Sequence, residues 1–167
     1  MNDMETDQHF PQVESPVDNM RVLSVRQPWS GAMFCDGPAE KTIENRSWWT
    51  KFRGVIAIHA SQKVDPAGME FLNMHGHIPA HDRGVVLGTV ELLEVHEARS
   101  SDCNLIGCLG DPWAEFPDDG HRIFHWEIGH PREFVTPIPA SGRLGLWEAG
   151  SVLNHLISIA DVVTGLS

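Results

Sequence analysis

LSVRQPWSGAMFCDGPAEKTIENRSWWTKFRGVIAIHAS, residues 23–61, lies in a segment whose charge differs from that of the rest of the chain. Residues 21–63, called here the basic segment, carry seven lysines and arginines against three acids, whereas the 167-residue chain has a net charge of −11. Trp29, Trp48 and Trp49 lie in the same segment. A planar aromatic can stack on a base while a neighbouring cation neutralises a phosphate, so the basic segment indicates a ligand of nucleotide type.

Alternating and β-branched runs along the chain predict six short strands. Gln27-Pro28 marks a helix start, because proline is tolerated at the first helical position, and Gly37 marks its end. The pairs Asp65-Pro66 and Asp111-Pro112 predict a second helix and a helical turn, and Gly88 predicts a bulge within its strand. The expected strands do not alternate regularly with helices along the chain. This order favours an α+β fold built on a closed or nearly closed β-barrel with helical insertions. The expected strands are residues 21–25, 41–46, 54–60, 85–95, 122–128 and 143–148.

The chain divides into three parts. Residues 1–20 are polar and acidic without apolar periodicity, so we expect a disordered acidic leader. Residues 21–149 are expected to form the barrel domain, since a chain of this length suits one core. Residues 150–167 place apolar side chains on one helical face. This predicts a C-terminal helix that either packs on the barrel or makes a homodimer contact.

Composition limits the location of the protein and its partners. No apolar run has the roughly 18 to 20 residues that a membrane helix needs, and the start lacks a secretory pattern. Three cysteines are few and odd in number, which favours reduced thiols and a cytoplasmic protein. The overall negative charge repels long polyphosphates, while screening leaves the basic segment free to act at short range. We therefore expect a compact or single-stranded ligand and disfavour long duplex DNA.

Several separate motifs resemble the ASCH domain, a branch of the PUA-like β-barrels. QPW follows the first strand at residues 27–29, and the GxKxxExR signature is represented by Lys41, Glu44 and Arg46. A tryptophan, RG and an I-x-A strand follow within residues 48–60, and the closing strands of the family resemble residues 125–149, with G-x-x-GLW at 142–147. The likeness covers nearly all of residues 21–149. One departure is Ala39, which stands where the family has the glycine of its signature.

The resemblance implies a PUA-like mixed or antiparallel barrel with a cleft for RNA, a nucleotide or a modified nucleoside. Lys41, Glu44 and Arg46 carry over as the signature residues of that cleft. Trp29 and Trp48 are candidates for stacking on a base, while Trp49, which alternates with Trp48, is expected to pack on the opposite side. The remaining binding candidates from the matching motifs are Gln27, Arg53 and His59.

The alternation of an extended segment places Glu44 and Arg46 on one face, with Ile43 in the core. Two arrangements are open for this pair. Glu44 and Arg46 can form a fixed ion pair, or Arg46 can take a phosphate while Glu44 accepts from the amino group of a base.

A second possibility is catalysis in the same cleft. One family branch resembles small amidohydrolases that deacylate N4-acetylcytidine with a lysine, a threonine three positions later and a distant glutamate. Here Lys41 is present, but Glu44 occupies the threonine position, and Glu91 is the candidate third group. A Lys41–Glu44 pair could still activate water for amide or RNA hydrolysis. A third possibility is a protein-interaction domain that uses the acidic remainder and the C-terminal helix.

Several histidines and cysteines of the chain are candidate metal ligands. His75, His77 and His81 lie close together, and Cys103 and Cys108 could add thiolates. No CxxC or other compact zinc spacing occurs, so we expect loop histidines and inert cysteines, with neither a metal nor a cofactor. The absence of Walker, GxGxxG and GxSxG motifs gives no support to nucleotide hydrolysis, dinucleotide redox chemistry or α/β-hydrolase chemistry.

Overall fold

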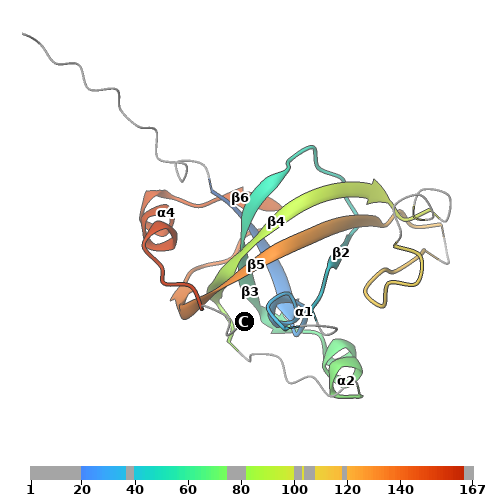
Figure 1. The fold of residues 1–167 in the computed structure, drawn as a ribbon, viewed down its shortest axis with the longest axis horizontal. Coiled ribbons are helices and arrows are strands. Elements are labelled where there is room, and N and C mark those ends of the chain that lie inside the picture. Colours follow the sequence, from blue (N-terminus) through green and yellow to red (C-terminus); the bar gives the residue numbers. More distant parts are fainter. Residues whose placement is uncertain are drawn as a thin grey trace, which may run out of the picture.

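The computed structural model describes residues 20–36, 40–74, 82–99, 103, 108–117 and 120–163. The expected leader (apart from Met20), the Gly37–Ala39 turn and His75, His77 and His81 lie outside these residues. The described chain forms one six-stranded sheet in the order β2-β5-β4-β3-β1-β6 (Figure 1). Its strands are β1 (Arg21–Gln27), β2 (Ile43–Arg46), β3 (Gly54–Val64), β4 (Val85–Glu97), β5 (Phe124–Pro139) and β6 (Leu146–Glu148). The helices are α1 (Trp29–Ala32), α2 (Pro66–Met74) and α4 (Ser151–Ser158).

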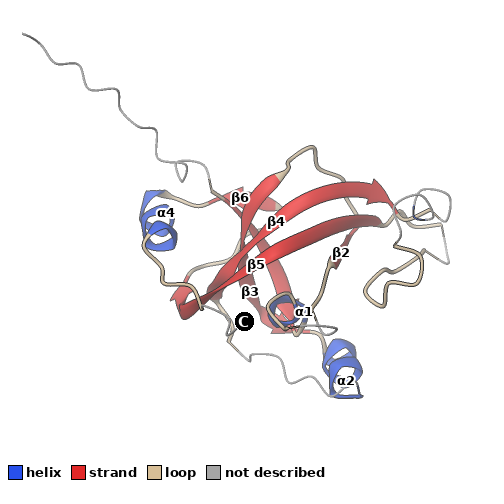
Figure 2. Ribbon diagram, viewed as in Figure 1, coloured by secondary structure: helices blue, strands red, loops and turns tan. Residues whose placement is uncertain are grey.

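The sheet is mixed and strongly twisted. Strand β1 pairs in parallel with β3, and the other neighbouring strands pair antiparallel. The sheet curls like a barrel but does not close between its outer strands β2 and β6 (Figure 2). The expected α+β class and barrel-like, PUA-like sheet are therefore confirmed, in the nearly closed form.

Apolar side chains fill both faces of the central strands. The β-branched run of β3 is fully buried at Ile56 and Ile58, which pack with Trp126 of β5 in the inner core. The opposite face carries a second cluster around Val22, Ala57 and Trp147. Helix α4 covers this second cluster and contributes the buried Ile157. Its Val152 and Leu156 remain exposed, and the homodimer contact stays a prediction.

Strands β4 and β5 form a long irregular ribbon. The register shifts between Val86 and Gly88, where the sequence predicts a bulge. Strand β5 starts at Phe124 and continues through Pro139, well beyond the expected end at residue 128. Strand β2 pairs only with residues 124–127 of β5, and later in β5 Phe134 forms an isolated antiparallel bridge with Val162.

The helices differ in length from the prediction. Helix α1 is a single turn, Trp29–Ala32, whereas the sequence predicts a helix reaching Gly37. Helix α2 begins at the expected proline and lies beside α1, far from α4 (Figure 1). No helix among the described residues is long and apolar enough to cross a membrane.

Candidate functional site

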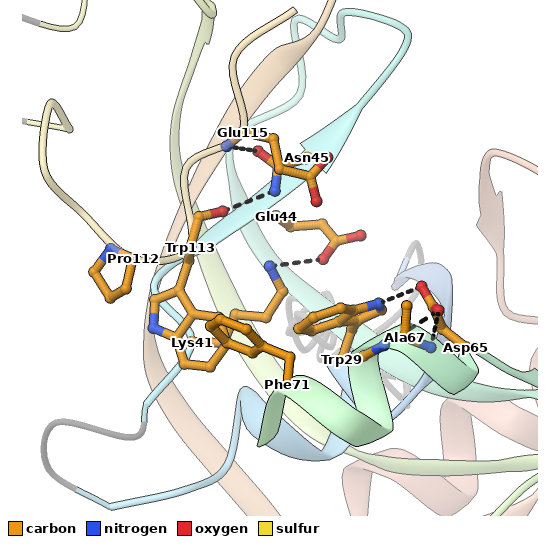
Figure 3. Close-up of a pocket in the computed structure, with 11 residues that line it drawn as sticks. Trp29, Lys41, Glu44, Asn45, Asp65, Ala67, Phe71, Pro112, Trp113 and Glu115 are labelled. Carbon is orange, nitrogen blue, oxygen red and sulfur yellow. Dashed lines mark hydrogen bonds and ion pairs between the residues drawn. The ribbon is translucent and has the colours of Figure 1, made fainter. Parts of the chain in front are cut away.

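A cavity of about 410 Å³ opens between α1, α2, β2 and the loop at residues 111–115 (Figure 3). We call it the tryptophan pocket, because indole rings from Trp29 and Trp113 form its walls together with Phe71. Polar groups of Glu44 and Asn45 enter from β2. The full lining is Trp29, Lys41, Glu44, Asn45, Asp65, Ala67, Gly68, Phe71, Pro112, Trp113 and Glu115.

Local hydrogen bonds hold the loop wall against β2. Asn45 donates from Nδ2 to the carbonyl of Trp113 at 2.8 Å and accepts from the backbone N–H of Glu115 at 3.1 Å. The Thr42 hydroxyl donates to the Asp111 carboxylate at 3.0 Å. Asp111 also accepts from the Trp113 N–H, and the structure has a simple turn here where the sequence predicts a turn of helix. The loop is thus bonded along β2 from Thr42 to Asn45.

Two of the three signature residues, Lys41 and Glu44, line this pocket, and Arg46 pairs with Glu44 from outside its lining. Glu44 Oε2 lies 3.3 Å from Lys41 Nζ, and Glu44 Oε1 lies 2.9 Å from an Arg46 guanidinium nitrogen. The side chains of Lys41 and Glu44 are 3% and 8% exposed, so the pair is shielded from water. The sequence left two arrangements open for Glu44 and Arg46, and the structure has the fixed ion pair. Because Glu44 also pairs with Lys41, its carboxylate lies between two cations. Ile43 is buried as expected.

Lys41 is held tightly. Its ammonium donates to the carbonyl of Ile43 and pairs with Glu44, which uses two of its three N–H donors. Nζ also lies 5.8 Å from the ring centroid of Trp29 and 5.7 Å from that of Trp113, within the range of cation–π attraction. The ammonium therefore sits between two indoles at the base of the pocket.

Asp65 connects Trp29 to α2. One carboxylate oxygen accepts from Trp29 Nε1 at 3.0 Å, and the other accepts from the backbone N–H groups of Ala67 and Gly68 in the first turn of the helix. The hydrogen bond from Trp29 is the main cause of the lowered pKa of Asp65. Asp65 is therefore a charged helix cap that also orients the indole.

A second cavity, of about 800 Å³, adjoins the first and shares Trp29, Glu44 and Asp65 with it. We call it the basic pocket, because four cationic side chains line it against two carboxylates. Trp29 and Glu44 thus stand at the boundary between an aromatic pocket and a cationic one. The four cations are Arg26, Arg46, Lys63 and Arg143.

His59 forms the floor of the basic pocket. Its Nε2 lies 3.0 Å from the carbonyl of Ala140, which can only accept, so Nε2 carries the proton. Nδ1 then accepts from the Ser24 hydroxyl at 3.2 Å, and that hydroxyl accepts from Trp147 Nε1. A Cβ on Gly142 would lie 2.4 Å from His59 Cε1, which explains the glycine of the closing motif.

This arrangement predicts a dependence of stability on pH. Burial lowers the pKa of His59 below its usual 6.5, so the unfolded chain binds the proton first as the pH falls. The free energy of unfolding should decrease below about pH 6.5. Replacing His59 by glutamine should flatten this decrease in urea unfolding from pH 8 to 5. The exposed His155 on α4 is the control, and an equal effect of His155→Gln would contradict the assignment.

The other expected site residues lie elsewhere. Gln27 is buried, and its side-chain amide donates to the carbonyl of Asp82 and accepts from the N–H of Gly31. Arg53 pairs with Glu94 and caps the carbonyls of Thr50 and Phe52. Neither residue lines either pocket, and a binding role for them stays a prediction.

Two further expectations are corrected. Trp48, expected to stack on a base, is partly buried and packs edge-on against Trp126 with ring centroids 4.6 Å apart, whereas Trp49, expected to pack, is 53% exposed. Trp126 also donates from its indole nitrogen to the backbone carbonyl of Trp48. Glu91 lies on β4 near His130 and lines neither pocket, so it is not placed as a third catalytic group.

The pockets also contain residues that the sequence interpretation did not select. The sequence marks Asp65 only as part of a helix start, and it predicts that Trp113 packs in the core or at the end of the barrel. Trp113 is indeed buried, but one face lines the tryptophan pocket. The helix-capping signal was the available clue to Asp65, whereas Asn45 and Arg143 carry no local signal and are placed by the tertiary fold.

Comparisons with known proteins agree with this architecture. No protein-family model matches the chain. Activating signal cointegrator 1 from Homo sapiens is 24% identical over 159 residues, covering 89% of this chain and 25% of that protein, and the Mus musculus protein gives the same values. The chain thus spans about a quarter of the length of these curated relatives.

A solved structure provides the comparison of folds. The crystal structure of ASCH from Zymomonas mobilis superimposes with a TM-score of 0.53 at 12% identity, covering 85% of this chain and 96% of that one. At this identity the likeness concerns the fold alone. The chain therefore has the fold of an ASCH domain, and the resemblance indicated by its sequence motifs is confirmed.

Proposed function

We propose that the two adjoining pockets bind one nucleotide or a nucleotide at the end of a single-stranded RNA, with the base in the tryptophan pocket and the phosphate in the basic pocket. The observation that carries this proposal is the position of Trp29 and Glu44 on the boundary of both cavities. A ligand with an aromatic end and an anionic end matches this division.

The tryptophan pocket supports the base end. Trp29, Phe71 and Trp113 offer ring surfaces within one cavity, and base–aromatic stacking contributes about 1–3 kcal/mol per base. Each oxygen of Glu44 keeps a second lone pair beside its ion pair. Glu44 can therefore accept a hydrogen bond from a base amino group while Lys41 and Arg46 hold it ionised and in place.

The basic pocket supports the phosphate end. Arg26, Lys63 and Arg143 are exposed at its surface, whereas Arg46 is anchored by Glu44 and by the carbonyl of Ser24. Exposed cations on different elements can close around a phosphate with charge-assisted hydrogen bonds. The acidic remainder of the chain favours a short ligand over an extended polyanion.

The test compares a nucleoside, its 5′-monophosphate, N4-acetylcytidine and a short single-stranded RNA by calorimetry at fixed salt. Lys63→Ala and Arg143→Ala should each weaken monophosphate binding about three- to tenfold and leave nucleoside binding nearly unchanged. Trp29→Ala should weaken both ligands, with circular dichroism confirming that the variant folds.

Arg122→Ala is the matched control for charge. Arg122 is exposed, pairs with Glu97 and lines neither pocket, so its removal should leave all affinities unchanged. Failure of every probe to bind, or equal losses for Arg122→Ala and Arg143→Ala, would reject the proposal.

Hydrolysis in the same site is a second candidate, because a shielded lysine–glutamate pair lies on the wall of a cavity. Glu44 replaces the threonine of the amidohydrolase branch, so the chemistry would use an activated water in place of a hydroxyl nucleophile. Release of cytidine from N4-acetylcytidine, or cleavage of a labelled RNA, that disappears in Lys41→Met would support this candidate. Binding without turnover of either substrate would leave a binding domain.

A further inference from the structure

Four side chains that can bind a metal meet at the end of the β4–β5 ribbon, away from the signature residues. His96 on β4 and His125 on β5 are direct register partners, so both imidazoles lie on the same face of the ribbon. Cys103 and Cys108, in the connection that follows β4, approach the same point. The side chains of all four residues are buried, and their ligand atoms lie within 4.8 Å of one another.

The distances match a tetrahedral site. Zinc–sulfur and zinc–nitrogen bonds of about 2.3 and 2.0–2.1 Å place neighbouring nitrogen and sulfur ligands about 3.5 Å apart. His96 Nε2 lies 3.3 Å from Cys108 Sγ and 3.6 Å from Cys103 Sγ. His125 Nδ1 lies 3.5 Å from Cys103 Sγ. Three of the six distances between ligand atoms therefore already have the spacing of the edges of a metal-centred tetrahedron, and the other three are no longer than 4.8 Å.

His125 has a hydrogen-bond partner on its other nitrogen, and the other nitrogen of His96 lies within ion-pair distance of a carboxylate. His125 Nε2 donates to the carbonyl of Glu115 at 2.8 Å, which leaves the lone pair of Nδ1 toward the sulfur atoms. His96 Nδ1 lies 3.4 Å from the Glu127 carboxylate, while its Nε2 faces both sulfurs. Metal-binding histidines characteristically donate their second N–H to a carbonyl or carboxylate, which fixes the tautomer and ring orientation.

We propose that His96, Cys103, Cys108 and His125 bind one Zn²⁺ ion with two thiolates and two neutral imidazoles. This donor set neutralises the ion completely, as a buried site requires, and soft thiolates with imidazoles favour zinc over magnesium or calcium. Four protein ligands leave no open coordination position, so the ion is structural. Binding releases the two thiol protons to solvent.

The proposed ion would anchor one wall of the tryptophan pocket. Both cysteines belong to the apolar cluster that contains Trp113, and Glu115, whose carbonyl binds His125, lines the pocket itself. Zinc would thus bond the loop that carries Trp113 to strands β4 and β5. This role is independent of which ligand, if any, the pockets bind.

The first test uses the full chain without substitution. Protein produced with zinc in the medium and then dialysed should retain about one zinc per chain by mass spectrometry of the elements. Cobalt replacement should produce the visible absorption of a tetrahedral thiolate–cobalt centre, and X-ray absorption at the zinc edge should show two sulfur and two nitrogen neighbours. A background metal content, or an oxygen-ligated octahedral spectrum, would overturn the proposal.

The second test uses matched cysteine variants. Cys103→Ser and Cys108→Ser should lose the bound zinc, whereas Cys35→Ser should keep it, because Cys35 lies outside the cluster. Chelation of the wild type should lower its melting temperature and restore the reactivity of Cys103 and Cys108 toward a thiol reagent. A Cys103–Cys108 disulfide in the protein as purified from reducing cytosol, or full zinc content in both serine variants, would contradict the site.

Discussion

Replacing Glu44 by glutamine should lower the free energy of unfolding by about 3–5 kcal/mol, the range found when one partner of a buried ion pair is removed. The amide keeps the shape of the side chain but takes away its charge. Lys41, 3% exposed and held between two indoles, would then keep its ammonium with no anionic partner, against the carbonyl of Ile43, the ring faces and a neutral amide oxygen. Urea unfolding at pH 7 measures the loss.

A double substitution separates the stranded charge from simple loss of packing. Lys41→Met with Glu44→Gln removes both ions and leaves an apolar side chain between Trp29 and Trp113. This double variant should be more stable than Glu44→Gln alone and lie within about 2 kcal/mol of the wild type. Ligand binding should fail in both variants, because the position of the carboxylate at the pocket boundary is lost.

The exposed pair of Arg21 and Glu148 provides the control. It has the same 2.9 Å separation as the Arg46–Glu44 contact, but its side chains are 35% and 59% exposed. Glu148→Gln should therefore cost less than about 1 kcal/mol. If the two glutamine variants lost equal stability, or if the double variant were less stable than Glu44→Gln, burial of the signature pair would not be the source of the effect.

Gly88→Ala is expected to destabilise the centre of the sheet by about 3 kcal/mol, at the upper end of the usual cost of overpacking. An added Cβ would lie 2.3 Å from the carbonyl oxygen of Arg132 and 2.9 Å from the Cα of Glu133. Because these are backbone atoms of the neighbouring strand, they cannot move aside as a side chain can. A fall in melting temperature of about 6–12 °C follows for a domain of this size.

Gly129→Ala is the matched control on β5. Its added Cβ would contact only Leu93, at 3.1 Å from a flexible terminal methyl on a side chain that is 44% exposed. This substitution should change the melting temperature by no more than a few degrees. Equal effects of the two alanines would show that the bulge at Gly88 can widen without cost.

Most strands were predictable because runs of β-branched and apolar residues mark buried strands in the local sequence. Residues 54–60 and 85–95 are β-branched and apolar, and the structure forms β3 and β4 over them. The second half of β5 was missed because prolines normally exclude a central strand. The later half of β5 nevertheless pairs with β4, while β2 reaches only residues 124–127, and only the pairing of distant strands reveals this arrangement.

The candidate site was predictable only in part for a similar reason. Alternation along the extended segment was sufficient to group Glu44 with Arg46, and the resemblance to the family signature added Lys41. Their surroundings come from the loop at residues 111–115 and from α2, and no local pattern links these to β2. The zinc ligands His96 and His125 likewise become neighbours only through the register of β4 and β5, so a search for compact spacing had no signal to find.

The pairing of β1 with β6 has a consequence for biosynthesis. Strand β1 pairs through Arg21, Val22 and Leu23 with Glu148, Trp147 and Leu146 of β6. One edge of β1 is therefore hydrogen-bonded to the last strand of the described chain. A ribosome would therefore expose β1 long before its partner has been translated. The nascent chain would hold an open strand edge throughout elongation, and only translation of β6 would protect that edge from association with other chains.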